Sequence, residues 1–276
     1  YADLIVSCGA VAAPVNLLWS AENRAHAVTI MNPAPLPLGR FSLVIAPRHD
    51  RIPVRPNVVQ TDGAVVARMP EDALRAARDR LLAHPRFRGA PAGPGHPTIA
   101  VFIGGDSARY EVSAAFADSL IQQVLAACDG VGGSCLVTTS RRTSPSVERV
   151  LAERLDRSSR CGLLLLASRD QLDGTMEGLM GAADVAVVTG ESISMVSEVC
   201  ASGRRVVVVE PAPRGRAAAA LTKHQRFLPL LAQEGCARMV PLPELGLAIP
   251  RALRDPPPGK RLESVEHIRE AVGKLL

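Results

Sequence analysis

Aromatic residues are scarce in this sequence: two Tyr, five Phe and one Trp make up 3% of its 276 residues. With so little material for base stacking, and with no RNA-binding signature, the composition argues against nucleic-acid binding. Aliphatic side chains must fill the core instead, because the hydrophobic fraction is 47%. A core of Val, Leu, Ile and Ala is typical of buried parallel strands covered by helices.

Long apolar runs are also missing. No run approaches the roughly 18 residues that span a bilayer, and no charged segment followed by an apolar stretch opens the chain. We therefore expect a cytoplasmic protein that is soluble or at most peripheral to a membrane. The six cysteines are scattered without a C-x-x-C pair, which favours buried, reduced thiols over disulfides or a metal site. A formal net charge of +5 fits an anionic small ligand or a membrane surface as easily as nucleic acid.

Three common enzyme signatures do not occur. Without G-x-x-x-x-G-K-[ST], ATP hydrolysis by a P-loop is not supported. Without G-x-S-x-G or H-E-x-x-H, the commonest hydrolase and zinc-protease interpretations are removed. The one His-acid pair in a turn-like segment is His49-Asp50. Such a pair can be a general base with the residue that orients it, although it more often only closes a turn.

Strand-like and helical segments alternate almost throughout, which indicates right-handed βαβ units and an α/β fold with parallel sheets. The length exceeds that of one typical domain, roughly 100 to 200 residues, so we expect two Rossmann-like domains. The proline- and glycine-rich segment 84–97 is the best boundary. We expect a small or incomplete N-terminal domain over 1–83, a linker over 84–97 and a C-terminal domain over 98–254. A helix within 255–276 should dock on a partner surface.

In the first domain the pattern predicts strands at 3–8, 26–31, 42–46 and 57–60, and helices at 12–21 and 70–83. In the second it predicts five strands, at 98–103, 135–139, 163–167, 185–188 and 205–209. The helices expected there are 112–127, 145–155, 174–182, 193–201 and 223–234.

Three strand-to-helix turns of the second domain are rich in glycine, hydroxyl groups and arginine. Ligands of open parallel sheets lie outside the carboxyl ends of the strands where the strand order switches direction, and the turns after the first and fourth strands flank that point. Glycine lets backbone approach a phosphate, and amides at a helix N-terminus can donate to it. Taken singly, each turn is also explained by helix capping, so the hypothesis of one anionic ligand depends on their convergence. The candidate residues are Gly104, Gly105, Ser107, Ser140, Arg141, Arg142, Thr143, Gly190, Ser192 and Ser194.

Two features extend these turns beyond simple anion binding. Arg141 and Arg142 add charge that can hold phosphate in a bidentate manner, unless they are only a solvated basic turn. Glu198 follows Ser194 by one helical turn. Its carboxylate can accept two hydrogen bonds from ribose hydroxyls, unless it is an ordinary surface glutamate. Groups that donate hydrogen bonds to phosphate, together with a carboxylate that accepts them from ribose, predict that the ligand is a nucleotide sugar.

Five segments together resemble the mitochondrial fission elongated-mitochondria family, which has many bacterial members and is often described as glycosyltransferases or labelled as nucleoside-diphosphate-sugar epimerases. The segments are FSLVIAPRHD at 41–50, NVVQTDGA at 57–64, IGGDS at 103–107, TTSRRT at 138–143 and VTGESISMVSE at 188–198. The resemblance covers roughly residues 3 to 240. It implies a two-domain glycosyltransferase of the B type whose C-terminal domain holds the sugar nucleotide.

The resemblance also implies roles for individual residues. A Gly-Gly-Ser-type first turn, here Gly104, Gly105 and Ser107, and a Ser ahead of a ribose-binding Glu, here Ser194 and Glu198, would hold the donor. No metal or other cofactor is implied, because helix amides and Arg balance the diphosphate. Family members usually begin with a further strand and helix that this sequence does not include, and this departure bears on independent catalysis. They also often carry Asn-Pro-Tyr before the fourth strand, where this sequence has RDQLDG at 169–174. This second departure bears on recognition of the donor base.

The leading hypothesis is therefore transfer of a glycosyl group from a nucleotide sugar to an unknown acceptor. Ser107, Arg141 and Ser194 would stabilise the developing diphosphate charge. His49 or Asp50 would be the catalytic base that activates the acceptor hydroxyl. Two alternatives remain: epimerisation of the nucleotide sugar, and a non-catalytic interaction protein of the mitochondrial fission type that keeps the fold as a scaffold.

Overall fold

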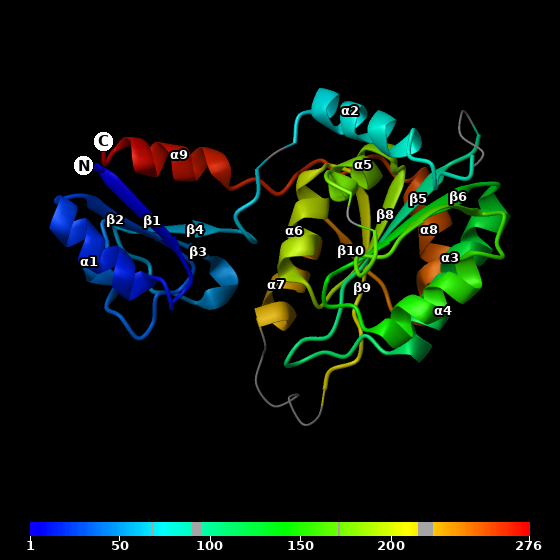
Figure 1. The fold of residues 1–276 in the computed structure, drawn as a ribbon, viewed down its shortest axis with the longest axis horizontal. Helices are drawn as coiled ribbons and strands as arrows, with labels where there is room; N and C mark the ends of the chain where they lie inside the picture. The colour runs from blue at the N-terminus through cyan, green and yellow to red at the C-terminus, as the bar shows by residue number, and fades with distance from the viewer. Residues whose placement is uncertain (68, 90–94, 171, 215–222) are drawn as a thin grey trace. The chain divides into compact units, whose positions relative to one another are not determined.

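The computed structural model describes residues 1–67, 69–89, 95–170, 172–214 and 223–276, which form two compact units (Figure 1). The first unit comprises Tyr1–Arg68 and Leu262–Leu276, and the second Met69–Arg261. Each contains one parallel sheet with helices packed on it. The expected α/β class with two Rossmann-like sheets is confirmed.

The first unit is built on a four-stranded parallel sheet in the order β1-β2-β3-β4. The strands are β1 (Leu4–Cys8), β2 (His26–Ile30), β3 (Leu43–Pro47) and β4 (Val58–Thr61). Helix α1 (Ala13–Asn23) packs on one face, where Ala13 joins a cluster with Val44 and Ala46. The buried Asn16 of α1 donates to the carbonyls of Ile5 (3.1 Å) and Val28 (2.7 Å), which ties the helix to β1 and β2.

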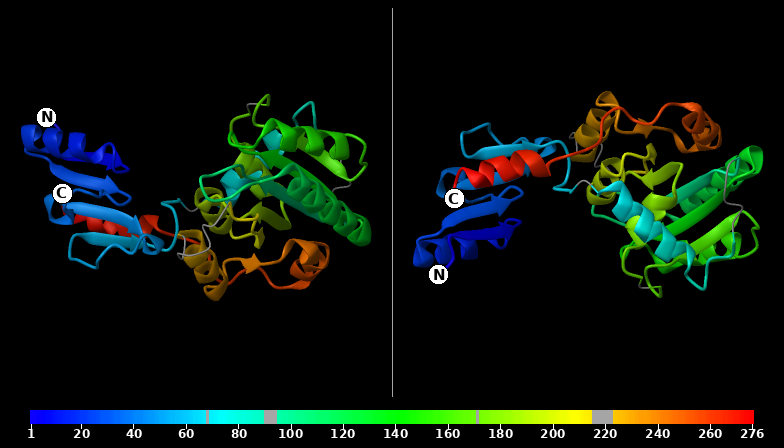
Figure 2. Two further views of the ribbon diagram at one scale, coloured as in Figure 1. Left: turned by 90° about the horizontal axis from the view of Figure 1, so that it is seen from below. Right: turned by 90° about the horizontal axis from the view of Figure 1, so that it is seen from above.

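The other face of this sheet is covered by the last helix of the chain, α9 (Val265–Gly273). Ile268 and Val272 of α9 pack against Val28, Leu43 and Ile45, residues that alternate with those facing α1. Figure 2 shows the ribbon of α9 running along this sheet. The spacing of apolar residues correctly indicated one binding face on this helix. The expected docking on a partner surface was wrong: the partner is the chain's own first sheet, whose second apolar face would otherwise be uncovered.

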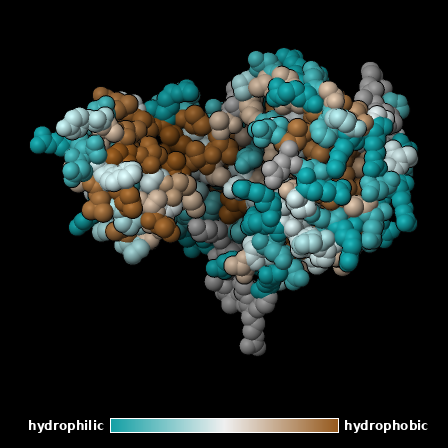
Figure 3. All heavy atoms as spheres, in the orientation of Figure 1, coloured by the Kyte–Doolittle hydropathy of each residue, from teal (hydrophilic) through white to brown (hydrophobic). Residues whose placement is uncertain are grey.

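Large apolar side chains are more exposed in the first unit than in the second. In the face shown in Figure 3, apolar residues gather on the first unit. On α1 and the turn before it, Val11, Val15, Leu18 and Trp19 are all exposed. Within the described residues, no helix is both long and apolar enough to cross a bilayer.

The second unit is built on a six-stranded parallel sheet in the order β10-β9-β8-β5-β6-β7. Its strands are β5 (Thr98–Ile103), β6 (Ser134–Thr139), β7 (Cys161–Leu165), β8 (Val185–Thr189), β9 (Arg205–Val209) and β10 (Arg238–Met239). The helices are α2 (Glu71–Leu82), α3 (Ala114–Val131), α4 (Pro145–Leu155), α5 (Thr175–Ala182), α6 (Ile193–Ala201), α7 (Lys223–Gln233) and α8 (Leu245–Arg254). Five strands were expected, and β10 adds a sixth beside β9.

Helix α2 belongs to the second unit, although the sequence placed it in the first. It lies against α5, where two glycines replace side chains at the contact. A Cβ at Gly181 would lie 2.1 Å from the Leu74 carbonyl oxygen, and one at Gly178 would lie 2.9 Å from Leu81 Cβ. This close approach fixes α2 to α5, so the compact units divide between residues 68 and 69 and not within 84–97.

The cysteines are all free thiols. Five are buried in the second unit, as the scattered spacing suggested, and Cys8 at the end of β1 is exposed.

Candidate functional site

A cavity of about 940 Å³ lies in the second unit, at the carboxyl ends of β6 and β8. The strand order switches direction beside it, because β5 pairs with β6 on one side and β8 on the other. The prediction that the first and fourth strands flank the switch is therefore confirmed. The residues that line the cavity are Ser107, Thr139, Ser140, Arg141, Arg142, Ala167, Met176, Glu191, Ser192, Ile193, Ser194, Met195, Glu198 and His224.

Of the glycines expected to approach a phosphate, Gly104 and Gly105 are instead packed against protein groups. The Gly104 amide donates to Thr189 Oγ1 (2.8 Å), and a Cβ at Gly104 would lie 1.6 Å from Glu191 Oε1. A Cβ at Gly105 would lie 2.1 Å from the Arg142 carbonyl oxygen. Neither glycine lines the cavity. Both are needed so that the turns after β5, β6 and β8 can meet.

The rest of the turn after β5 closes on itself. Ser107 Oγ accepts hydrogen bonds from the amides of Tyr110 (3.0 Å) and Arg109 (3.3 Å). Asp106 accepts from the Val112 amide (3.0 Å) and from Arg214 (2.7 Å). Ser107 lines the cavity, with its hydroxyl hydrogen as the group left for a ligand.

The turn after β6 combines a closed backbone with open charges. Thr143 is buried; its Oγ1 accepts from the Ser140 amide (2.9 Å) and donates to the Gly104 carbonyl (2.6 Å). Ser140 Oγ accepts from the Arg142 amide (3.2 Å). Arg141 and Arg142 are exposed on the cavity wall and make no ion pair within the described residues. Thr143 and Ser140 thus fix the turn, and the two arginines face the cavity.

The turn after β8 ends in an uncapped helix. Ser192 stands at the N-cap of α6 but makes no side-chain cap bond. First-turn amides of a helix have no partner within the helix, and those of Ser194 and Met195 find no acceptor in the part of the chain described. Gly190 lies behind this turn, where its amide donates to the Val209 carbonyl (2.9 Å). An open helix N-terminus on a cavity wall is suited to bind an anion.

Glu198 lies farther along α6 and is half-buried in the cavity lining. Burial raises the pKa of its carboxyl, and the nearby charge of Glu177 adds to this effect. Met176 of α5 lines the same region. The sequence-based placement of Ser194 and Glu198 on one side of α6 therefore agrees with a common cavity.

Glu191 is a lining residue that sequence reasoning missed. It is only 2% exposed, its Oε1 accepts from Thr189 Oγ1 (3.3 Å), and its Oε2 is buried without a hydrogen-bond partner among the described residues. Burial raises the pKa of the carboxyl, while its own amide, Thr189, Arg142 and the Gly105 amide act in the opposite direction. An acid within a glycine-containing turn could have drawn attention to it, but its burial depends on residues distant in sequence.

His224 at the start of α7 was also missed. Its Nε2 lies 2.6 Å from the Glu191 carbonyl oxygen, and its ring contacts Tyr110 edge-on at a centroid distance of 4.9 Å. Since a carbonyl only accepts, Nε2 is the donor and the neutral ring presents Nδ1 as an acceptor. Nδ1 is buried without a partner in the described structure, and burial lowers the pKa of His224. No sequence spacing connects His224 with the three turns.

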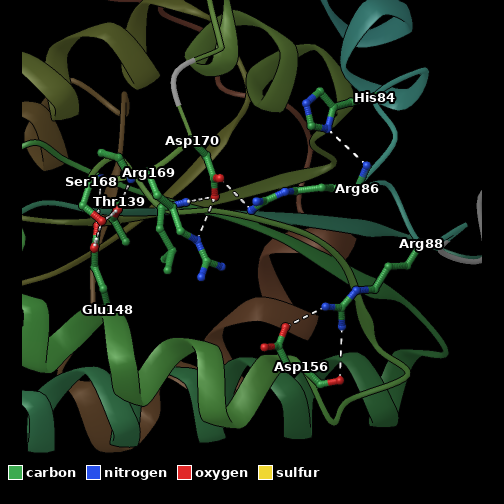
Figure 4. Close-up of polar contacts among 11 residues, drawn as sticks. His84, Arg86, Arg88, Thr139, Glu148, Asp156, Ser168, Arg169 and Asp170 are labelled. Carbon is green, nitrogen blue, oxygen red and sulfur yellow. Dashed lines mark hydrogen bonds and ion pairs between the residues drawn. The ribbon is translucent and has the colours of Figure 1, made fainter.

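A polar network connects two lining residues of the cavity, Thr139 and Ala167, to α4, and Figure 4 shows its side-chain contacts. Thr139 Oγ1 donates to Glu148 Oε1 (2.8 Å) and accepts from the Ala167 amide (2.8 Å). Ser168 also donates to Glu148. Farther along, Asp170 pairs with Arg86 (2.6 Å). These contacts fix the loop at 166–170. This loop overlaps the start of segment 169–174, where family members often carry Asn-Pro-Tyr, and residue 171 of that segment lies outside the described residues.

The family model described as Mitochondrial fission ELM1 matches residues 1–268. The chain belongs to this family. Mitochondrial fission protein ELM1 of Arabidopsis thaliana is 28% identical to it over 236 residues, which cover 75% of this chain and 51% of that protein. The chain thus spans about half the length of the curated relative that it matches.

Solved structures similar to this ELM1-family chain share its fold. A protein of Listeria monocytogenes assigned as a UDP-N-acetylglucosamine 2-epimerase has a TM-score of 0.64 at 11% identity, covering 99% of this chain and 74% of its own. The Neisseria meningitidis 2-epimerase bound to UDP-GlcNAc scores 0.59 at 13%, covering 99% and 76%. MurG of Acinetobacter baumannii scores 0.51 at 15%, covering 99% and 73%. The shared fold is the glycosyltransferase B type.

The segments that carried the ELM1-family resemblance divide between the two units. Segments 103–107, 138–143 and 188–198 form the three turns at the cavity of the second unit. Segment 41–50 lies in the first unit and ends in a 3-10 turn over Arg48–Asp50. There His49 Nε2 lies 3.9 Å from Asp50 Oδ1, with side chains 4% and 2% exposed. The pair exists as expected, and its role as a base stays a prediction.

Proposed function

We propose that the second unit binds a nucleotide sugar in the cavity beside β6 and β8, and that the chain transfers the sugar to an acceptor. The observation that carries this is on α6. Its open N-terminal amides can bind a diphosphate, and Glu198, on the next turn of the same helix, can accept from ribose hydroxyls. One rigid element thereby presents both kinds of group that such a ligand needs.

The charge around the cavity supports an anionic ligand. Arg141 and Arg142 face it without ion-pair partners in the described part of the chain. Ser107 and Ser194 offer hydroxyl groups to phosphoryl oxygens. Two proteins with the same fold are a 2-epimerase solved with UDP-GlcNAc and Staphylococcus aureus MnaA solved with UDP. We propose that amides and arginines suffice to hold the diphosphate, so EDTA will leave binding unchanged.

Calorimetry against UDP-, GDP-, ADP- and CMP-sugars tests the proposal. At least one should bind, and Glu198→Ala and Arg142→Ala should each weaken it by about tenfold or more, since a charge-assisted hydrogen bond contributes about 1.5–3 kcal/mol. Glu153→Ala and Arg75→Ala are matched controls, because these exposed residues lie outside the cavity lining. Failure of every sugar to bind, or unchanged affinity in both site variants, would exclude the proposed site.

The reaction itself is tested with the ligand that binds. Release of the free nucleotide (the nucleoside diphosphate, or CMP from a CMP-sugar) only when acceptor is added supports transfer, whereas an epimerised sugar formed without acceptor indicates epimerisation. A protein partner whose binding is unaffected by Glu198→Ala would indicate a scaffold instead. His49→Gln should abolish product formation without changing donor affinity if His49 is the base; unchanged turnover would remove it from that role.

A further inference from the structure

Glu191 occupies an unusual place for an acid. It precedes the N-cap of α6 and lines the cavity, yet only 2% of it is exposed. One carboxyl oxygen, Oε1, is used by Thr189 Oγ1, and the other, Oε2, has no partner within the described residues. A Cβ at Gly104 would lie 1.6 Å from Oε1. The neighbouring turn therefore has a glycine where any side chain would displace this carboxyl group.

An ionised Glu191 would conflict with the site around it. Its negative charge would stand beside the α6 N-terminus, where the proposed diphosphate binds, and would repel that ligand. A buried carboxylate also needs hydrogen bonds to most of its lone pairs, and Oε2 accepts none from the described part of the chain. A protonated carboxyl fits better, because it has one O–H group to donate and Oε2 is the oxygen left for it.

The groups that face Glu191 come from every surrounding turn. Thr189 lies on β8, the Gly105 amide on the turn after β5, Arg142 on the turn after β6, and His224 on α7. Burial is the largest influence on its pKa and raises it, whereas Arg142 and the amides oppose this rise. The side chain of His224 donates to the backbone of Glu191 and is itself held toward its neutral form. Arg142 is thus the one full cation of this set, and it is exposed.

We propose that Glu191 is a proton-dependent ligand-binding group. With a proton on Oε2 it donates to a phosphoryl oxygen at the α6 N-terminus; without the proton, its charge repels the ligand. For a nucleotide sugar this rests on the proposed function, but the same chemistry applies to any divalent oxyanion at this helix end. Affinity for such anions should therefore fall as pH rises through the titration of Glu191.

The test measures the Kd of the nucleotide sugar that binds in the calorimetric panel, between pH 5.5 and 8.5. The charge of its diphosphate diester is constant over this range. Affinity for the unaltered chain should fall with pH, approaching tenfold per unit once Glu191 ionises, because one proton is then taken up on binding. Glu191→Gln, which keeps the shape and a donor, should lose this fall in affinity with rising pH and bind at least tenfold more tightly at pH 8.5.

Two matched variants separate Glu191 from its neighbours. Glu210→Gln changes an exposed carboxylate that accepts from Tyr110 (2.7 Å) near His224. His224→Gln removes the imidazole that donates to the Glu191 backbone. Both should keep the falling profile of the unaltered chain. The proposal would be overturned if Glu210→Gln or His224→Gln lost the pH dependence while Glu191→Gln kept the same falling profile as the unaltered chain.

A second probe distinguishes this inference from the proposed function. Sulfate has a constant charge over the range and needs no ribose group, and its binding can be followed by protection against thermal unfolding. Suppose that no nucleotide sugar binds, but that sulfate protects the unaltered chain only at low pH and protects Glu191→Gln at every pH. The proposed function then fails, and the inference about Glu191 stands. If the nucleotide sugar binds with the same pH profile to the unaltered chain and to Glu191→Gln, the proposed function stands and the inference fails. If the unaltered chain and Glu191→Gln show the same pH dependence for both sulfate and nucleotide sugar, Glu191 is not a proton-dependent binding group.

A direct titration guards against a misfolded variant. The ¹³C signal of the Glu191 side-chain carboxyl in the unaltered chain should titrate over the same pH range in which affinity falls. A carboxyl already ionised at pH 5.5 would overturn the proposal whatever the variants show.

Discussion

The turns after β5 and β8 look alike in sequence and differ in how their polar groups are used. Each has glycine, an acid and a serine before a helical segment. In the turn after β5, Asp106 and Ser107 accept from nearby amides. In the turn after β8, the Ser192 side chain makes no cap bond, and the buried Oε2 of Glu191 has no hydrogen-bond partner among the described residues. The first turn is closed by its own hydrogen bonds, and the second is the turn that we propose binds the ligand.

The glycines do not mark this difference. In the turn after β5 they make room for Glu191 and the Arg142 backbone, and a Cβ at Gly190 would lie 3.0 Å from Leu228 Cδ1 of α7. In both turns, then, glycine permits contact between protein segments. Polar groups that have no partner in the described structure, rather than glycine content, are the reason why we propose that the turn after β8 faces the ligand.

The largest expected effect tests the supporting role of the turn after β5. Gly105→Ala should lower the free energy of unfolding by about 3 kcal/mol, because its Cβ would meet backbone that cannot move away easily. Gly130→Ala in α3 is the control. A Cβ added there would meet no atom within 4 Å apart from its chain neighbours and the backbone of its own helix, so stability should be unchanged or rise by up to about 1 kcal/mol. Urea unfolding measures both, and equal stability of the two variants would contradict the packing role.

A smaller effect should separate the turn after β6, which carries Arg142, from the turn after β5 by ligand binding. Arg142→Gln should weaken nucleotide-sugar binding by about tenfold, the order of 1.4 kcal/mol. Ser107→Ala should change it by less than about threefold, because the oxygen of Ser107 already serves the Tyr110 and Arg109 amides. Calorimetry on both variants provides the comparison. A larger loss in the Ser107 variant would reverse the roles assigned to these positions.

The sequence predicted the strands of the second sheet well because their apolar runs are bounded by turn residues, and the switch point followed from strand order. It missed β10, which has two residues, and α8, which contains Pro250. It assigned α2 to the wrong unit because the contact through Gly178 and Gly181 joins segments about 100 residues apart. Local patterns fix elements, whereas packing between distant helices decides to which unit they belong.

The candidate site shows the same division. Hydroxyl and arginine residues in the turns could be found from their position after strands, and the structure brings Ser107, Ser140, Arg142, Ser194 and Glu198 to one cavity. Gly104, Gly105, Thr143 and Gly190 lie behind it and hold the turns together. Glu191 and His224 could not be found from the sequence. Each is distinguished by a buried polar atom without a partner among the described residues, and that property arises only when the turns after β5, β6 and β8 and helix α7 pack together.

The smallest expected effect concerns the stability of the chain without ligand. Burial raises the pKa of Glu191 in the folded state, so the stability that its proton provides is complete below the pKa of the unfolded chain and is lost as pH rises through the folded value. Glu191→Gln cannot lose a proton and escapes this loss. The variant should therefore match the unaltered chain in unfolding midpoint at pH 4 and exceed it increasingly toward pH 8. A constant difference across this range would show that the Glu191 carboxyl titrates alike in the folded and unfolded chain.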